Sequence, residues 1–263
     1  MRAKKKLGQH FLSNKNILEL MCSAAEITGE NTVLEAGPGL GTLTEILAER
    51  AKKVIAVEKD RDLIPFLKEK FRNKKNVEIV EGDILAVSPP LGGLTAKSYK
   101  IVANIPYYIT SHFLRLFLSE TKFKPKLMVL MIQKDVAERI MARDGKPACR
   151  QGRESLLSLS VKAYGRPEIV KIVPRGAFSP PPKVDSAIIK ITPFYSPLKV
   201  RGARGVMKID PEKILSLARL AFQKKRKMLR QSIGKKVNLP PQYETSRPEE
   251  LSLEDWLKIL KSC

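Results

Sequence analysis

Five short apolar runs alternate with helical patterns in the first half of the chain, and this alternation restricts the fold more than any other feature. The runs are Val33–Ala36, Val54–Glu58, Val77–Val80, Lys100–Asn104 and Leu127–Ile132. Strands this apolar are buried on both faces, as in a parallel sheet that helices cover on each side. The pattern therefore predicts a doubly wound, Rossmann-like α/β sheet with helices on both faces.

Helical patterns fill the intervals between the runs, and Asn14 is a typical residue at the start of a helix. The expected helices are Ser13 or Asn14 to Met21, Thr42–Glu49, Leu63–Phe71, Ser111–Leu118, one carrying Val136, Ala137 and Ile140, and Leu156–Tyr164. Two late strands are expected at Ile169–Val173 and Ala187–Ile191. Between them, the prolines of Phe178–Pro182 cannot donate to a central ladder and predict a loop.

The last part of the chain differs in composition. Residues 195–210 are rich in Pro, Gly and Arg, which predicts a linker between a domain over 1–194 and a small α-helical, basic C-terminal domain over 211–263. One helix is expected over Ile214–Ile233, with a basic polar side, and a closing helix over Pro248–Leu260. There Leu253 and Trp256 would face a small core.

The formal net charge of +22 limits the partners. With a pI of about 10.0, the chain favours polyanions, nucleic acid before an anionic membrane, although a solvated lysine-rich surface is the alternative. The three cysteines, Cys22, Cys149 and Cys263, lie far apart, and His10 and His112 lack metal-ligand spacing. We therefore expect no metal and a reducing cytoplasm. We find no run of signal-peptide or membrane-spanning length, which predicts a soluble protein without a membrane partner.

A glycine-rich turn follows the first apolar run, in the sequence Glu35-Ala-Gly37-Pro-Gly39-Leu-Gly41. Glycines between a strand and a helix let the backbone approach a nucleoside cofactor closely. Glu58, at the end of the second run, could accept two hydrogen bonds from ribose hydroxyls, and Asp83 could meet an adenine amino group. The G-x-G-x-G spacing and the acidic Glu35, tolerable beside a sulfonium cation but repulsive beside a pyrophosphate, favour S-adenosyl-L-methionine over NAD. A packing turn that binds nothing remains the alternative.

The sequence Asn104-Ile105-Pro106-Tyr107 ends the fourth run, at the strand end where open α/β sheets place ligands. Adenine N6 is a poor nucleophile because its lone pair is delocalised into the ring. The Asn104 side-chain oxygen and the Ile105 carbonyl could orient that lone pair and stabilise the charge that develops on nitrogen. Pro106 would stiffen the loop, and Tyr107 would offer a stacking face. Alone, the motif could equally be a turn with a half-buried tyrosine.

Together these motifs resemble the KsgA/Dim-type ribosomal RNA adenine dimethyltransferases over nearly the whole chain. The glycine turn, Glu58, Gly82-Asp83 and Asn104–Tyr107 stand in that family's order. The other similar motifs are Gly8–Leu12, Phe178–Ser186 with its F-x-P-x-P-x-V-x-S pattern, and the basic Ala221–Lys227. The resemblance implies the sheet of class I methyltransferases. It also implies transfer of four methyl groups to two adjacent adenosines near the 3′ end of small-subunit ribosomal RNA, during maturation of the subunit.

The resemblance assigns contacts with S-adenosyl-L-methionine to His10, Leu12, Gly37, Glu58, Asp83 and Asn104. The expected cofactor site is His10, Leu12, Glu35, Gly37, Gly39, Glu58, Lys59, Asp83, Ile84 and Asn104. The adenine would lie between Tyr107 and Phe178, with Asn104, Ile105 and Pro106 completing the catalytic group. After one transfer a single N–H remains, so the pocket must accept a methyl group in place of one hydrogen bond.

The dense basic run after Ala221 is expected to bind RNA phosphates, although it could be a solvated helix face. Its residues are Lys224, Lys225, Arg226, Lys227 and Arg230. We expect a monomer that acts on the immature small subunit. The alternatives are an Erm-type large-subunit methyltransferase, which the segments Phe222–Gln231 and Arg247–Leu251 disfavour, a non-catalytic RNA-binding assembly factor, and a dehydrogenase.

Overall fold

The computed structural model describes residues 4, 8–86, 94–95, 98–142, 153–195, 198–202, 205–224 and 226–262. These fall into two compact units. The first contains residues 1–137 and 168–193, and the second contains 138–167 and 194–263. The chain therefore enters the second unit, returns to the first for its last sheet strands, and enters the second again. Residues 138–167 group with the second unit, and the last crossing lies between Pro193 and Phe194.

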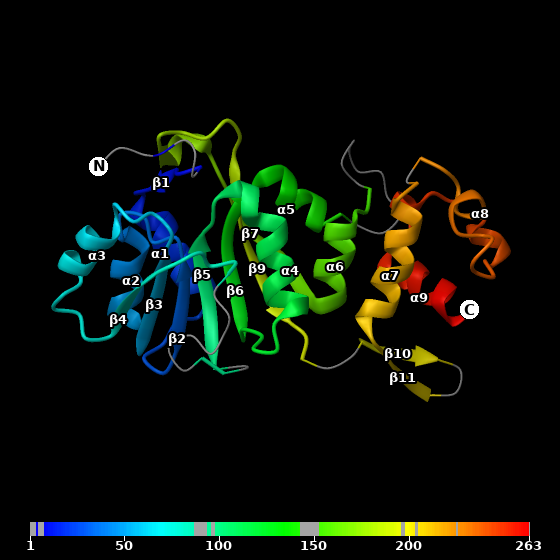
Figure 1. The fold of residues 1–263 in the computed structure, drawn as a ribbon, viewed down its shortest axis with the longest axis horizontal. Helices are drawn as coiled ribbons and strands as arrows, with labels where there is room; N and C mark the ends of the chain where they lie inside the picture. Colours follow the sequence, from blue (N-terminus) through cyan, green and yellow to red (C-terminus); the bar gives the residue numbers. More distant parts are fainter. Residues whose placement is uncertain are drawn as a thin grey trace. The chain divides into compact units, whose positions relative to one another are not determined.

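A seven-stranded sheet forms the middle of the first unit, in the order β4-β3-β2-β5-β6-β9-β7 (Figure 1). Its strands are β2 (Thr32–Ala36), β3 (Lys53–Glu58), β4 (Val77–Glu81), β5 (Tyr99–Asn104), β6 (Leu127–Gln133), β7 (Gly165–Val173) and β9 (Ser186–Pro193). The five strands predicted from the apolar runs pair in parallel. β9 instead pairs antiparallel to β6, with Met131 opposite Ile188, so the sheet is mixed.

Helices follow the strands as the sequence predicts. They are α1 (Lys15–Ala24), α2 (Thr42–Arg50), α3 (Ile64–Lys70), α4 (Thr110–Arg115) and α5 (Lys134–Ile140). α1 begins where Asn14 accepts a hydrogen bond from Ile17 N, which confirms the predicted cap. The helix expected over Ser111–Leu118 is α4 continued by one wider turn, η4 (Leu116–Glu120).

Consecutive residues of the central strands point to opposite faces, and those of β5 and β6 are buried on both. Val102 and Val129 pack into a core with α1 and α2, to which Met21 and Leu47 contribute. Their neighbours along each strand are equally buried. Both faces of the sheet are therefore covered, which confirms the doubly wound α/β prediction.

A second, two-stranded pairing joins distant parts of the first unit. β1 (Phe11–Leu12) runs antiparallel to β8 (Phe178–Ser179), with Leu12 opposite Phe178. The proline-rich stretch Phe178–Pro182 was expected to be a loop, and its first two residues are this short strand. Its prolines follow the paired residues, so they remove no donor from the ladder.

The second unit is built on α6 (Leu156–Tyr164), α7 (Pro211–Phe222) and α9 (Leu253–Lys261), which pack on one another. Leu159, Ile214 and Trp256 are buried among them. The expected linker contains an antiparallel hairpin of β10 (Leu198–Gly202) and β11 (Gly205–Ile209). Its β-branched residues lie among Gly and Arg, which conceals the strand pattern.

The prediction of one helix over Ile214–Ile233 is wrong. α7 ends at Phe222, and a separate four-residue helix, α8, covers Leu229–Ser232. Between them lies most of the basic run. On a continuous helix Lys224 would face Lys227, three positions on, and Arg226 would face Arg230, four positions on, and these like charges would repel one another.

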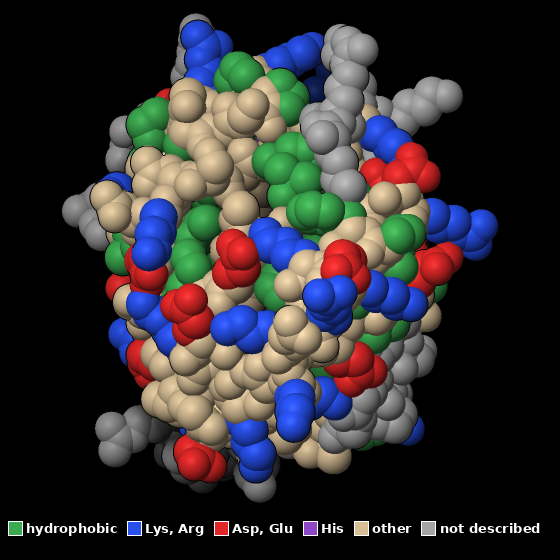
Figure 2. All heavy atoms as spheres, turned by 90° about the vertical axis from the view of Figure 1, so that its left-hand side faces the viewer, with side chains coloured by type: hydrophobic (Ala, Val, Ile, Leu, Met, Phe, Trp, Pro, Cys, Tyr) green, Lys and Arg blue, Asp and Glu red, His purple; other side chains and the backbone are tan. Residues whose placement is uncertain are grey.

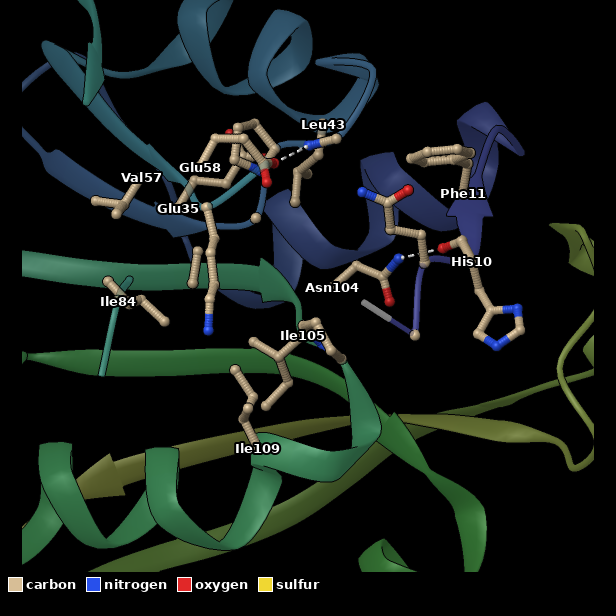
Figure 3. A pocket seen from close by; sticks show the side chains of 18 of the residues that line it. His10, Phe11, Glu35, Leu43, Val57, Glu58, Ile84, Asn104, Ile105 and Ile109 are labelled. Carbon is tan, nitrogen blue, oxygen red and sulfur yellow. Dashed lines mark hydrogen bonds between the residues drawn. The ribbon is translucent and has the colours of Figure 1, made fainter. Parts of the chain in front are cut away.

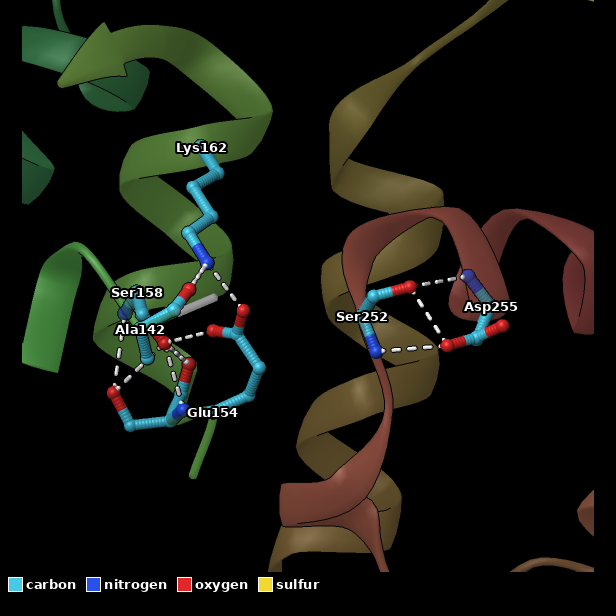
Figure 4. Close-up of polar contacts among 7 residues, drawn as sticks. Ala142, Glu154, Ser158, Lys162, Ser252 and Asp255 are labelled. Carbon is cyan, nitrogen blue, oxygen red and sulfur yellow. Dashed lines mark hydrogen bonds and ion pairs between the residues drawn. The ribbon is translucent and has the colours of Figure 1, made fainter. Parts of the chain in front are cut away.

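Buried polar contacts fix the ends of the helices in the second unit (Figure 4). Glu154 is 6% exposed, pairs with Lys162 and accepts a hydrogen bond from Ser158. At the start of α9, Ser252 and Asp255 form a reciprocal capping box, in which the Ser252 hydroxyl accepts from Asp255 N across 3.1 Å. Such caps stabilise a helix by about 1 kcal/mol each.

Candidate functional site

The connection order of the sheet decides where a ligand can bind. From β2 the chain proceeds outward to β3 and β4 and then returns to place β5 on the other side of β2. The loops that leave the carboxyl ends of β2 and β5 therefore diverge and leave a crevice. A pocket lies there, and both predicted motifs line it (Figure 3). It is lined by 8–12, 35–40, 57–59, 82–84 and 104–109, together with Leu18, Thr42 and Leu43.

The glycine turn depends on backbone conformations that favour glycine. Gly37, Gly39 and Gly41 have φ values of 69°, 59° and 74°. A Cβ on Gly39 would lie 3.0 Å from the Phe11 ring, and one on Gly41 would lie 2.7 Å from the Phe71 ring. A Cβ on Gly37 would meet no atom within 4 Å. Two of these glycines thus permit close packing of the turn, whereas Gly37 leaves open space beside the pocket.

Glu58 holds the turn from the end of β3. Its side chain accepts hydrogen bonds from Gly39 N across 3.1 Å and from Asp60 N across 2.8 Å. Burial raises the pKa of this carboxyl, and the two backbone donors oppose that shift. Each carboxylate oxygen can accept more than one hydrogen bond, so the pair could also take two ligand hydroxyls.

Glu35 lies one layer deeper, at 1% exposure on β2. The Thr44 hydroxyl donates to its Oε2 across 2.7 Å. Burial raises the pKa of Glu35 to about 8, which favours the neutral carboxylic acid at pH 7. The predicted acidic side chain lines the pocket.

Asp83 follows β4 and lines the pocket together with Ile84. Lys59 Nζ lies 2.7 Å from Asp83 Oδ2, and Leu85 N donates to the other oxygen. The Lys59 contact lowers the pKa of this carboxyl despite its partial burial. Acidic residues at the carboxyl ends of β2 and β3 and after β4 thus line one pocket at the edge of the sheet.

Asn104 is the last residue of β5, and its side-chain amide is oriented by one contact. Nδ2 donates to the backbone carbonyl of His10 across 3.0 Å. A carbonyl can only accept, so Oδ1 is left as an acceptor on the other side. Figure 3 shows this oxygen pointing away from His10, toward the side of Ile105. In the described part of the chain no donor reaches Oδ1.

The turn after Asn104 places an aromatic ring beside the pocket. Pro106, with φ of −57°, leads into a short 3-10 helix, η3 (Tyr107–Ile109). The Tyr107 hydroxyl lies 2.7 Å from the Ser186 hydroxyl, and burial raises the pKa of the phenol. The ring stacks on His10, with centroids 5.9 Å apart.

The three other predicted residues lie on the paired strands β1 and β8 or beside them. The ring of His10 donates from Nδ1 to the carbonyl of Pro180 across 2.8 Å, and His10 is one of the residues that line the pocket. Leu12 is buried at the pocket wall and its carbonyl accepts from Thr42 Oγ1. Phe178 is 4% exposed and packs in the core beside Leu12 instead of lining the pocket.

Four residues of this site were not predicted as functional. Gln9 donates a hydrogen bond to Asp60, and Thr42 donates one to the carbonyl of Leu12; both contacts fix the segment that carries His10. The hydroxyl of Ser186 is hydrogen-bonded to that of Tyr107. Gln9 and Ser186 stand inside motifs quoted for the family resemblance, and that position was the available signal. Nothing in the sequence marks Asp60 or Thr42, because their partners are distant along the chain.

Three basic residues of the second unit, Lys224, Arg226 and Lys227, line a hollow together with Gln223 and Gln231. Arg230 is exposed nearby on α8, and Lys225 lies outside the described residues, as do Cys149 and Cys263. On the face of the first unit seen in Figure 2, by contrast, Lys and Arg are interspersed with Asp and Glu.

The described residues contain neither a membrane-spanning helix nor a cluster of metal ligands. None of the helices within them combines the length and the apolar character needed to cross a bilayer. Nor do those residues contain three His, Cys, Asp or Glu side chains grouped so that they could hold a metal ion.

Comparison with known proteins gives long matches. A family model described as ribosomal RNA adenine dimethylase matches residues 1–258. The ribosomal RNA small subunit methyltransferase A of Dehalococcoides mccartyi (strain CBDB1) is 42% identical over 270 residues, covering 98% of this chain and 88% of that protein. The protein of the same name from Alkaliphilus metalliredigens (strain QYMF) is 36% identical over 277 residues, covering 99% and 91%.

Two solved structures match over nearly their whole length. A dimethyladenosine transferase from Plasmodium falciparum gives a TM-score of 0.75 at 29% identity, covering 95% of this chain and 96% of that one. The 23S rRNA methyltransferase ErmE gives a TM-score of 0.74 at 28% identity, covering 96% and 98%. The fold is therefore that of these methyltransferases.

Proposed function

The chain belongs to the ribosomal RNA adenine dimethylase family, and we propose that it dimethylates the N6 amino groups of two adjacent adenosines near the 3′ end of small-subunit ribosomal RNA. The methyl donor is S-adenosyl-L-methionine. The observation that carries the proposal is the orientation of Asn104, whose amide donates to His10 and so presents Oδ1 beside the pocket. An acceptor in that position is what methylation of an exocyclic amine requires.

The pocket fits this donor. Glu58 has room for two ribose hydroxyls, because each of its oxygens takes one backbone donor. Asp83, whose pKa is lowered, is ionised at pH 7 and can accept from an adenine amino group. Gly37 leaves space for close approach of the ligand. A cation beside Glu35 would favour loss of the proton that its raised pKa retains, so the buried acid suits a sulfonium.

When bound, S-adenosyl-L-methionine supplies a methyl group on positively charged sulfur. The chain supplies orientation. Asn104 Oδ1 and the Ile105 carbonyl accept from the two N6 hydrogens of adenine, which turns the nitrogen lone pair toward the methyl donor. The same oxygens stabilise the positive charge that develops on N6, a contribution of about 3–4 kcal/mol for one well-placed group. The ammonium-like product is acidic and loses its proton readily, so a strong base is unnecessary.

Tyr107 holds the base that has left its stack. Its ring is half-buried, and Ser186 fixes its hydroxyl at 2.7 Å. Stacking of a base on such a ring is worth about 1–3 kcal/mol. We propose Phe178 as the second aromatic residue of the adenine site. Its ring is buried, so it must become accessible when RNA binds.

The second methylation uses one acceptor fewer. After the first transfer N6 keeps a single hydrogen, so only one of the two oxygens can be satisfied. The remaining N6 hydrogen can be accepted by Asn104 Oδ1 or by the Ile105 carbonyl. In either case Asn104 keeps its hydrogen bond to His10, so its orientation is the same in both steps. The methyl group already present must then occupy the space opposite the remaining acceptor.

RNA is held by the basic residues of the second unit. Lys224, Arg226 and Lys227 line one hollow, a suitable place for a phosphate group of the backbone. We assign Lys225 and Arg230 the same role. A duplex would be recognised through its shape and phosphates, because A-form RNA hides its base edges in a deep groove. We also propose that the protein acts as a monomer in the cytoplasm, where the immature small subunit would be its partner.

The similarity to ErmE leaves large-subunit RNA as the second candidate, because its TM-score of 0.74 matches that of the dimethyladenosine transferase. The relatives at 42% and 36% identity carry the small-subunit name. The test is incubation of unmethylated small and large subunits with labelled S-adenosyl-L-methionine, followed by mass spectrometry of the RNA. We expect two dimethyladenosines per small subunit. Methylation confined to the large subunit would refute the substrate, and no methylation of either would refute the activity.

A further inference from the structure

The segment Gly8–Leu12 forms one wall of the pocket, and its backbone also sets the orientation of Asn104. The acceptor for the Asn104 amide is the carbonyl of His10, a main-chain atom. The direction of Asn104 Oδ1 therefore depends on where the peptide plane after His10 lies. Any contact that fixes this peptide plane acts on the proposed chemistry without touching the substrate.

On its C-terminal side the His10 peptide is fixed by backbone and hydroxyl contacts. Leu12 pairs with Phe178 in the short β1–β8 ladder. The Thr42 hydroxyl, at the start of α2, donates to the carbonyl of Leu12 across 3.0 Å. The ring of His10 donates to the carbonyl of Pro180 across 2.8 Å. These contacts tie the end of the segment to the rest of the first unit.

On its N-terminal side the segment is fixed by one carboxylate. Asp60 has a side chain only 3% exposed, and it accepts from Gln9 Nε2 across 2.9 Å and from Lys4 Nζ across 2.6 Å. Lys4 also pairs with Asp62, whose backbone N donates to Asp60 Oδ1 across 3.1 Å. Burial alone would raise the pKa of Asp60, but donation from Lys4 and Gln9 outweighs it and lowers that pKa.

Asp60 is also connected to the cofactor side of the pocket. Its backbone N donates to Glu58 Oε1, and Glu58 Oε2 accepts from Gly39 N in the glycine turn. Hydrogen bonds and short stretches of backbone thus lead from the glycine turn through Glu58, Asp60 and Gln9 to the carbonyl of His10.

From this arrangement we propose that Asp60 and Gln9 are positioning residues for the transfer, which hold the His10 peptide so that Asn104 presents its oxygen to the adenine amino group. The inference rests on the proposed methyl transfer and adds to it a link between the ribose-binding carboxylate and the acceptor amide. Neither residue contacts the reacting atoms. Asp60 and Gln9 should therefore affect mainly the rate of transfer in the assembled complex, and cofactor affinity much less.

The test uses Gln9→Met, which removes the donor to Asp60 and the acceptor of Lys4 N while keeping the length of the side chain. We expect the single-turnover rate on small subunits, at saturating S-adenosyl-L-methionine, to fall about fivefold, as for the loss of one net hydrogen bond. The affinity for S-adenosylhomocysteine should change less than threefold. Lys4→Met should also lower the single-turnover rate, whereas Lys4→Arg, which keeps the charge, should react at the wild-type rate. Arg72→Met, which breaks an exposed pair with Glu69 in the same unit, is the control and should leave it unchanged.

The outcomes separate this inference from the proposed function. If the wild-type protein transfers no methyl group, the function itself fails, and the positioning role fails with it. If wild type is active and Gln9→Met reacts within twofold of it, the positioning role is wrong and the function stands. A loss of transfer rate that disappears at saturating cofactor would mean that the segment only forms a wall of the cofactor pocket. That result would also overturn the positioning role. If Gln9→Met lowers the melting temperature by more than a few degrees, the variants Lys4→Met and Lys4→Arg replace it, and their transfer rates are judged by the same criteria.

Discussion

Asn104 donates its side-chain amide to the backbone carbonyl of His10 across 3.0 Å, although the two residues are 94 positions apart in the chain. The contact joins the end of β5 to the segment that precedes β1. It determines the direction of the amide oxygen without help from a substrate. An acceptor fixed in advance requires little reorganisation during the reaction, which is the main advantage of such a site.

The glycine turn gives a matched pair of variants. Gly41→Ala places a methyl group 2.7 Å from Phe71 at a positive φ, so we expect a loss of stability of about 2 kcal/mol or more. Gly37→Ala keeps only the backbone strain of about 1–2 kcal/mol, but its Cβ points into open space beside the pocket. Denaturant unfolding and titration with S-adenosylhomocysteine separate the two. Gly37→Ala should lose more affinity than Gly41→Ala, and the opposite ranking would contradict the assigned roles.

Glu35 should make stability depend on pH. The pKa of this carboxyl is raised from 4.5 to about 8 in the folded protein. The folded state therefore keeps a proton that the unfolded state has lost, and stability falls as pH rises from the lower value through the higher one. The cost at high pH is on the order of a few kcal/mol. Glu35→Gln lacks this term, so its melting temperature relative to wild type should increase between pH 5 and pH 9. A difference independent of pH would show that Glu35 is ionised.

The hydroxyl contact of Tyr107 can be tested apart from its ring. Ser186→Ala removes the partner 2.7 Å away, and Tyr107→Phe removes the hydroxyl itself. Each should reduce the transfer rate about two- to tenfold, as expected for one neutral hydrogen bond. Tyr107→Ala also removes the stacking face and should cost about 1–3 kcal/mol more. Single-turnover rates give the comparison, and equal rates for the Phe and Ala variants would exclude stacking.

The basic run of the second unit should govern RNA affinity. Alanine at Lys225, Arg226 and Lys227 should make the plot of log affinity against log salt shallower by about 2, because each phosphate contact contributes about 0.7 to 0.9. Affinity for S-adenosylhomocysteine should not change. Alanine at Lys68, Lys74 and Lys75, which are exposed in the first unit, is the control. If both triple variants change the slope equally, RNA binding is a diffuse effect of net charge.

Much of the first unit follows from local pattern. The apolar runs that end at Ala36, Glu58 and Asn104 become the parallel strands whose carboxyl ends meet at the pocket, because burial on both faces is a property of each strand alone. The glycine turn and Asn104 are brought together because strand order fixes which loops are neighbours.

The features that sequence reasoning missed depend on contacts between distant residues. β1 and β8 are two residues long and have no period of their own, so Leu12 and Phe178 reveal their pairing only in three dimensions. The position of Phe178 in the core has the same origin. In the second unit, apolar spacing continues past Phe222, and the pattern therefore overestimated the length of α7. The spacing of apolar residues carries no information about repulsion between like charges in the basic run.

The most direct test of this account is the rate of methyl transfer by Asn104→Ala and Asn104→Asp, measured in single turnovers on small subunits at saturating S-adenosyl-L-methionine. Asn104→Ala removes the acceptor and should lower the rate by about 10²- to 10³-fold. Asn104→Asp keeps an acceptor oxygen but cannot donate to His10, so it should fall between alanine and wild type. If the alanine variant reacts within tenfold of wild type, Asn104 does not orient the amino group, and the mechanism is wrong.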